Sequence, residues 1–356
     1  MELCSPLWPA SPSNSVMRLD YDIPAVAPYI NWEYFYHAWG LHGQPAEDRQ
    51  QLRQEADDML ARLAGHYRTH ALFRLFPAYS DGDDIVCRVT DEKCGVRSDE
   101  CGVRSVRIPF LRQQQADSDF LCLADFISPD ESPRDERLEM RDERYDYSHG
   151  VQGNHISHFS PLTSHLETPL TSHLEPPLSS HLETPLSSQL DPASTLGLFA
   201  ATVDLGLETD FANDVYQQMM VQLLADRLAE ATAERMHQEV RTRYWGYAPD
   251  EQLSIEQLHR ESFQGIRPAV GYPSLPDTSL HFIIDSLIGL RQVGIRLSEH
   301  GAMKPHASVC GFMMAHPCAC YFSVGPIGPD QLSDYAARRG LPIAVVRKFL
   351  ASVYRY

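Results

Sequence analysis

An eight-residue unit repeats four times across residues 161–192, and it constrains the fold more than any other feature of the chain. The copies read PLTSHLET, PLTSHLEP, PLSSHLET and PLSSQLDP. The proline in every copy prevents a continuous helix, and each copy is too short to be one unit of a solenoid. The few leucines cannot offset the entropy lost on ordering. We therefore expect residues 130–194 to be a disordered insertion, with the folded domain assembled from residues 17–129 and 195–356 and an N-terminal tail at 1–16.

Hydrophobic periodicity and turn residues predict helices and strands that do not alternate regularly. Helices are expected at residues 31–39, 45–65, 211–243, 330–340 and 342–353, with a short one beginning at the Ser254–Gln257 capping box. Strands are expected at 84–89, 104–109, 308–314 and 319–324, the last two forming a hairpin around His316-Pro317. This order predicts an α+β fold: a single domain with a mainly antiparallel twisted sheet and long helices. No GxGxxG follows a strand, which disfavours a Rossmann-type methyltransferase.

Charge and cysteine content exclude several classes of function. The net charge of −18 and the absence of a basic stripe argue against nucleic-acid binding. No apolar run approaches the ~20 residues of a membrane span, and no signal peptide is evident. The eight cysteines include no CxxC pair, so we expect reduced thiols, no metal site and a cytoplasmic protein. The repeated His165, His173 and His181 are explained by duplication of the unit rather than by metal binding.

The segment RPAVGYP (267–273) is the strongest candidate for a binding loop. Pro268 and Pro273 stiffen the backbone, and Gly271 permits a close approach. Arg267 offers a planar fork of donors that suits a carboxylate, although a solvated Arg in a simple turn is the alternative. The polar face of the long helix carries Asp226, Glu230, Glu234 and His237, for which a solvated face is expected.

Motifs throughout the chain, taken in order and spacing, resemble the reactivation (S-adenosylmethionine-binding) domain of cobalamin-dependent methionine synthase. They are YINWEYFYHAWGLHGQP (29–45), LFPAYSDGDDI (75–85), CLADFISP (122–129), LADRLAEATAERMHQEVR (224–241), YWGYAPDEQLS (244–254), RESFQGIRPAVGYP (260–273), ASVCGFMMAHPCACYFSVGPI (307–327) and DQLSDYAARRG (330–340). The resemblance extends from residue 29 to about residue 350 and is interrupted by the insertion.

This resemblance implies a site for S-adenosylmethionine and no catalytic acid or base in the chain. The residues at the family's ligand positions are Asn31, Glu230, Glu261, Arg267, Ala269, Tyr272, Tyr321 and Phe322. It also implies a methyl acceptor, cobalamin, which a partner methionine synthase chain carries, and an electron donor, which is flavodoxin or a flavin reductase. We therefore expect the reactivation subunit of a split methionine synthase, which supports reductive methylation of cob(II)alamin to methylcobalamin.

Asn31 departs from the family pattern, in which an Asp usually precedes the Trp. The amide keeps hydrogen-bonding capacity but loses the charge that strengthens a bond to an ammonium group. Two alternatives therefore stay open. One is a ligand-poor binding or regulatory module that docks on a cobalamin-binding protein without donating a methyl group. The other is a methyltransferase that acts directly on a different acceptor.

Overall fold

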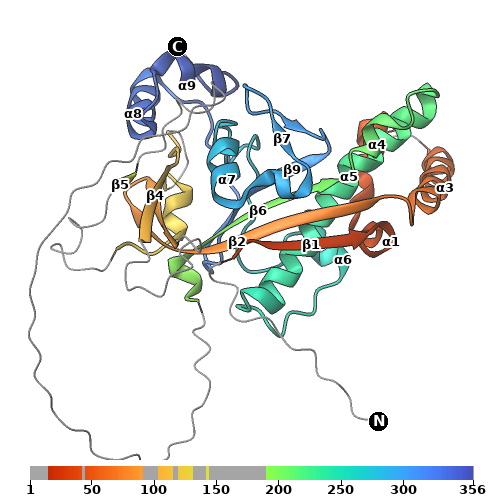
Figure 1. Ribbon diagram of the computed structural model, residues 1–356, viewed down its shortest axis with the longest axis horizontal. Helices are drawn as coiled ribbons and strands as arrows, with labels where there is room; N and C mark the ends of the chain where they lie inside the picture. The colour runs from red at the N-terminus through yellow and green to blue at the C-terminus, as the bar shows by residue number, and fades with distance from the viewer. Residues whose placement is uncertain are drawn as a thin grey trace, which may run out of the picture.

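The fold centres on a seven-stranded sheet in a computed structural model that describes residues 15–41, 45–90, 103–114, 119–130, 142–143 and 190–355. Its strands are β1 (Met17–Asp22), β2 (Arg68–Asp81), β3 (Asp84–Thr90), β4 (Val103–Pro109), β5 (Asp142–Glu143), β6 (Thr195–Val203) and β9 (Ser308–Met313). The order is β5-β4-β3-β2-β6-β9, and β1 pairs with the first half of β2 (Figure 1). Every pairing is antiparallel except β4 with β5, which confirms the expected α+β class.

Strands β2 and β6 form the centre of the sheet, and their side chains reach a separate core on each face. Residues 69–77 of β2 pair with the whole of β6, and every residue of β6 is buried. Phe199 and Ala201 face one core, whereas Leu198 and Ala200 face the other. A strand covered on both faces carries a continuous apolar run rather than an alternating one, as the TLGLFAATV sequence of β6 does.

Helices cover both faces of this sheet (Figure 1). The first core is closed by α1 (Ile23–Val26), α2 (Trp32–Trp39), α3 (Ala46–Leu63) and α5 (Val215–Glu239). The second is closed by α7 (Leu280–Ile288) and a 3-10 turn, Leu123–Phe126. The helices α8 (Pro329–Arg339) and α9 (Ile343–Phe349) pack on each other in a third cluster, and α8 contacts β4. None of the helices in the described ranges is long and apolar enough to cross a membrane.

Several helix ends follow the expected signals. Ser254 and Gln257 form the predicted capping box at the start of α6 (Ile255–His259). The long helix is shorter than expected, because α5 starts at Val215 and passes at Val240 into one π-helical turn, Val240–Tyr244. The first turns of α5 extend beyond the core, so the apolar side chains of Val215 and Met219 are 80% and 45% exposed.

The prediction of a hairpin from residues 308–314 and 319–324 is wrong for the second strand. Residues 319–324 form no strand, although β9 forms as predicted. β9 pairs instead with β6 on one edge and with residues 266–270 on the other. The only two-stranded ribbon in the described chain is β7 (Arg296–Leu297) with β8 (Met303–Lys304).

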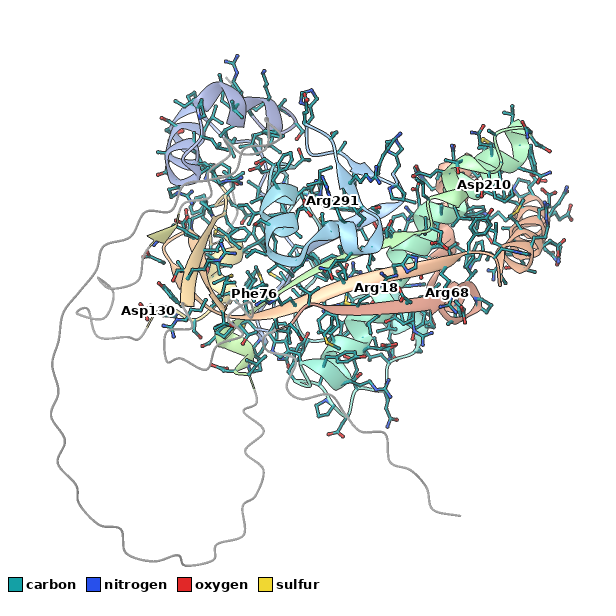
Figure 2. All side chains as sticks on the ribbon, in the orientation of Figure 1. Arg18, Arg68, Phe76, Asp130, Asp210 and Arg291 are labelled. Atoms are coloured by element: carbon teal, nitrogen blue, oxygen red, sulfur yellow. The ribbon has the colours of Figure 1, made fainter. Side chains whose placement is uncertain are left out.

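The expected insertion lies mainly outside the described residues, but its two ends meet. The Ser128 N–H donates to the Ala193 carbonyl at 2.7 Å. After β5, the described chain resumes at Leu190, inside the last repeat, and Leu190 packs against the first core. Asp191 then accepts bonds from the Ala193 N–H and the Ser194 hydroxyl. Asp130, the last described residue before this gap, lies at the β4 end of the sheet, opposite Asp210 (Figure 2).

A buried ion pair joins the segment after RPAVGYP to the C-terminal helices. Arg339 Nη1 on α8 lies 2.8 Å from Asp277 Oδ2, and both side chains are almost fully buried. The Tyr335 hydroxyl donates to the same Asp277 oxygen, and Arg339 Nη2 donates to the Ser279 hydroxyl. This network holds residues 277–279 against α8.

We predict that residues 131–189 can be replaced by a Gly-Ser linker of about ten residues without loss of stability. Such a linker spans about 17 Å on average, which suffices for ends that meet at Ser128 and Ala193. The deletion removes β5 but keeps Leu190 and Asp191. Thermal unfolding should give a nearly unchanged Tm. A fall of more than about 4 °C, equivalent to about 1 kcal/mol, would show that the removed segment stabilises the domain.

We predict that Arg339→Ala lowers the free energy of unfolding by about 3 kcal/mol. The substitution leaves the buried Asp277 carboxylate with only the Tyr335 hydroxyl and the Ser279 N–H as partners. Urea denaturation of the parent and the variant measures the loss. Arg347→Ala, at an exposed position on α9, is the matched control and should change stability by less than about 0.5 kcal/mol. Equal effects of the two substitutions would contradict the prediction.

Candidate functional site

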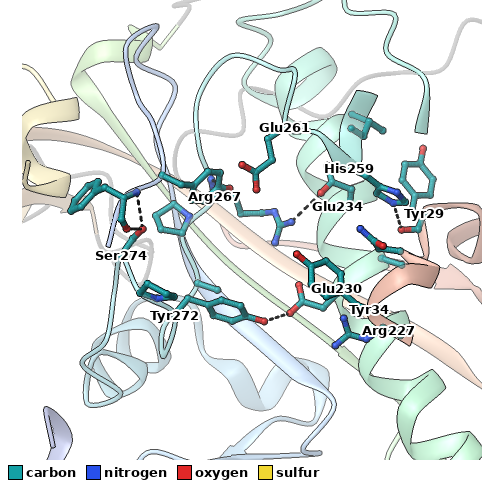
Figure 3. A pocket seen from close by; sticks show the side chains of 18 of the residues that line it. Tyr29, Tyr34, Arg227, Glu230, Glu234, His259, Glu261, Arg267, Tyr272 and Ser274 are labelled. Atoms are coloured by element: carbon teal, nitrogen blue, oxygen red, sulfur yellow. Dashed lines mark hydrogen bonds and ion pairs between the residues drawn. The ribbon is translucent and has the colours of Figure 1, made fainter. Parts of the chain in front are cut away.

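A pocket of about 720 Å³ opens between α5, the start of α2, the end of α6 and two loops, 267–274 and 321–323 (Figure 3). Its volume lies within the range of small-molecule sites. All eight residues singled out from the sequence line this pocket: Asn31, Glu230, Glu261, Arg267, Ala269, Tyr272, Tyr321 and Phe322. The structure therefore brings together side chains that are up to 291 positions apart in the sequence.

Backbone pairing along β9 positions the Arg267 loop. Ile266 pairs with Met314, and Ala269 pairs with Gly311. A Cβ atom at Gly311 would collide with the Pro268 carbonyl and the Ala269 Cα, so glycine permits this close approach. Gly271 then takes a φ of +92°, which favours glycine, and the chain turns away from the sheet.

Arg267 is buried at the wall of the pocket rather than solvated. Its side chain is only 11% exposed, and its Nη2 donates to Glu234 Oε2 at 3.2 Å. The guanidinium carbon lies 5.4 Å from the centre of the Phe199 ring in β6, within the range of a cation–π contact. Burial acts to lower the pKa of Arg267, but the charge of Glu234 and further groups at the pocket raise it overall. The alternative of a solvated arginine in a simple turn is therefore wrong.

Two hydrogen-bonded anchors hold the second loop against the first. The Tyr321 hydroxyl accepts from the Arg267 N–H at 2.8 Å. The Ser274 hydroxyl donates to the Phe322 carbonyl and accepts from the Phe322 N–H. These contacts explain how residues 319–324 are fixed without forming a strand.

Acidic side chains occupy the pocket wall around Arg267. Glu230 Oε1 accepts from the Tyr272 hydroxyl at 2.6 Å. Burial, followed by the charge of Glu230, raises the pKa of that tyrosine. Glu261, two residues after the end of α6, has a φ of 55°, a strained value for a residue other than glycine. Such strain is often found at functional sites. Its pKa is raised by burial and then by the charge of Glu234.

The expectation of a solvated polar face on the long helix is wrong for Glu234 and His237. Glu234 is 13% exposed and pairs with Arg267. His237 is fully buried, and its Nδ1 accepts from Arg241 Nη1 at 2.8 Å. Burial lowers the pKa of His237, as do the charges of Arg241 and Arg267, so the ring is neutral. Arg241 is itself held by both carboxylate oxygens of Glu251.

Asn31 caps a helix and also lines the pocket. It is the N-cap of α2, and its Oδ1 accepts from the Glu33 N–H at 3.2 Å. Asn is among the residues preferred at this position. The position thus combines capping of a helix with exposure to the pocket.

Sequence reasoning missed several residues that line the pocket. Tyr29, Tyr34, Arg227, Glu234 and His259 were not assigned to it. The signal for Glu234 was available, because it lies four positions after Glu230 and so shares its helix face. The contact between His259 Nε2 and the Tyr29 carbonyl, at 3.0 Å, depends on the packing of α6 against the N-terminal segment and has no such signal.

The pocket therefore combines the buried cation of Arg267 with nearby carboxylates and four tyrosines, Tyr29, Tyr34, Tyr272 and Tyr321. A guanidinium binds a carboxylate, and a carboxylate binds an ammonium group, so the arrangement suits a ligand that carries both charges. No group of three His, Cys, Asp or Glu side chains suited to a metal ion occurs in the described part of the chain. Cys318 and Cys320 are exposed free thiols.

Comparison with known proteins identifies the family. Residues 22–140 and 184–340 match the family described as vitamin B12 dependent methionine synthase, activation domain. The unmatched residues between these ranges lie within the expected insertion. The chain is also similar to a solved structure described as the MetH reactivation domain bound to AdoHcy, with 30% sequence identity and a TM-score of 0.70 over 98% of this chain and 93% of the other. The chain therefore belongs to the activation-domain family of vitamin B12-dependent methionine synthase.

Proposed function

We propose that this chain binds S-adenosylmethionine in the pocket around Arg267 and presents its methyl group to a cobalamin carried by a partner. The observation that carries the proposal is the buried guanidinium of Arg267 facing a pocket rich in carboxylates. The similar solved structure is bound to AdoHcy, which is what remains of S-adenosylmethionine after methyl transfer.

Residues of the two loops around the pocket suit different chemical groups of S-adenosylmethionine. Arg267 suits the carboxylate, because its fork can donate two parallel hydrogen bonds. Ala269 and Phe322 offer backbone and apolar surface for the adenosine, and their loops are held together through Ser274. Tyr272, at the mouth of the pocket and 51% exposed, adds ring surface on the side of Glu230.

Methyl transfer from a sulfonium needs no acid or base in this chain. The positive sulfur is already a good leaving group, so the pocket has to bind the ligand and orient its methyl group. Cobalamin, held by a methionine synthase partner, accepts the methyl group in this proposal. Flavodoxin or a flavin reductase would supply one electron to cob(II)alamin on the partner, so that methylcobalamin can form. S-Adenosylhomocysteine is the product left in the pocket.

We predict that Arg267→Ala weakens the binding of S-adenosylmethionine by about 2–3 kcal/mol, because the ligand carboxylate loses a charged partner. Arg267→Lys should recover only part of the affinity, since lysine lacks the two-pronged geometry. Isothermal titration calorimetry measures both. Arg260→Ala, at an exposed arginine outside the pocket, is the control. Unchanged affinity in Arg267→Ala would place the ligand elsewhere, and no binding by the parent would favour a docking module that is not a methyl donor.

We predict that Asn31→Asp tightens binding by about 1 kcal/mol. A carboxylate can cap α2 with one oxygen and offer the other to the ligand ammonium, while its desolvation offsets part of the attraction. Titration with S-adenosylhomocysteine and with its deaminated analogue separates this effect from general electrostatics. The gain should be smaller for the analogue. Equal gains for both ligands would show that position 31 does not contact the ammonium group.

A further inference from the structure

The ion pair between Arg267 and Glu234 in the pocket contains two buried polar atoms without hydrogen-bond partners within the described ranges, one on each side chain. Arg267 Nη2 donates to Glu234 Oε2, but Arg267 Nε and Glu234 Oε1 have no hydrogen-bond partner among the described residues. Leaving a buried donor or acceptor unpaired costs about 1–3 kcal/mol per group. An unpaired donor and an unpaired acceptor at adjacent side chains in a pocket are the pattern expected where a ligand supplies the missing partners.

The other polar side chains near Arg267 are already engaged or more exposed. Asn31 Oδ1 caps α2, and Glu230 Oε1 accepts from Tyr272. Glu261 is an exposed residue whose carboxyl is only partly shielded, so the carboxylate keeps contact with water. Glu234 alone combines a buried carboxylate oxygen without a partner with direct contact to Arg267.

The chemistry of an amino-acid ligand fits this pair. Its carboxylate and ammonium are attached to the same carbon, so the groups that bind them must be neighbours. Arg267 binds the carboxylate in the function proposed above, and Glu234 is the carboxylate that touches Arg267. Glu234 Oε2 can therefore keep its bond to Arg267 while Oε1 receives an N–H of the ligand.

Resting on the proposed function, we infer that Glu234 is the residue that binds the ligand's α-ammonium group, through Oε1. Arg267 and Glu234 then form one clamp that selects ligands with a free amino-acid end. Glu234 lines the same pocket as Asn31, so it can supply the negative charge that Asn31 lacks.

The test compares two ligands in four proteins. S-Adenosylhomocysteine and its deaminated analogue, which keeps the carboxylate, are titrated calorimetrically into the parent, Glu234→Gln, Glu234→Asp and Glu256→Gln. The Gln at 234 preserves size and can still accept from Arg267, while the charge is lost. Glu256, an exposed carboxylate on α6 outside the pocket, is the matched control. Thermal unfolding of each protein monitors the fold, and Glu234→Asp keeps the charge on a side chain that is one methylene shorter.

The inference gives a specific pattern. The parent should prefer S-adenosylhomocysteine to the deaminated analogue by about 10- to 100-fold, the range expected for a hydrogen bond to a charged group. Glu234→Gln should lose most of this preference by weakening only the amino ligand, and Glu234→Asp should retain the preference at lower affinity. Glu256→Gln should match the parent.

Two results would overturn the inference while leaving the proposed function intact. Equal weakening of both ligands by Glu234→Gln would mean that Glu234 only holds Arg267 in place, and unchanged binding would mean that it contacts neither group. An Arg267→Ala variant that binds both ligands as tightly as the parent would instead reject the proposed site itself, and the clamp with it.

Discussion

The pairing of residues 266–270 with the edge of β9 is the constraint on which the site depends. It is made by backbone groups of Ile266, Pro268 and Val270, and it is possible because Gly311 has no side chain on that face. Once the loop lies on β9, Arg267 is placed over Phe199 of the neighbouring strand and against α5. The second loop then attaches to the first through Tyr321 and Phe322. The sheet therefore serves as a rigid support, and the pocket is formed by segments that are attached to it.

Electrostatics inside the pocket is set by a small number of buried charges. Arg267 is close enough to Glu230 and Glu234 for both to favour its charged form, and Glu234 in turn disfavours the charged form of Glu261. Behind them, the neutral His237 and the Arg241–Glu251 pair fill the space between α5 and the following loop. A low-dielectric surrounding strengthens each of these interactions, so a zwitterionic ligand end would be held by few contacts.

Local signals in the sequence were reliable where a single element decides the outcome. The capping box at Ser254, the helix that begins after Asn31 and the helix end at Gly340 were all readable from neighbouring residues. The prediction of a strand at 319–324 was wrong because it relied on the β propensity of aromatic and β-branched residues. Both edges of β9 are already occupied, by β6 and by the 266–270 segment. The prediction of a solvated polar face on α5 was wrong for a related reason. Periodicity shows that Glu234 and His237 share a side of the helix, but it cannot show that another loop covers that side.

The sequence by itself determined the α+β class, the family and the eight residues that line one pocket, because long motifs and helix signals are local and because the resemblance transfers positions one by one. The tertiary structure alone decided how those residues act on one another. Burial of Arg267, its pairing with Glu234 and the two unpaired atoms beside that pair arise from the meeting of β9, α5 and the 266–270 segment. Burial and charge pairing depend on distances between segments remote in the chain, and no periodicity or spacing within one segment encodes those distances.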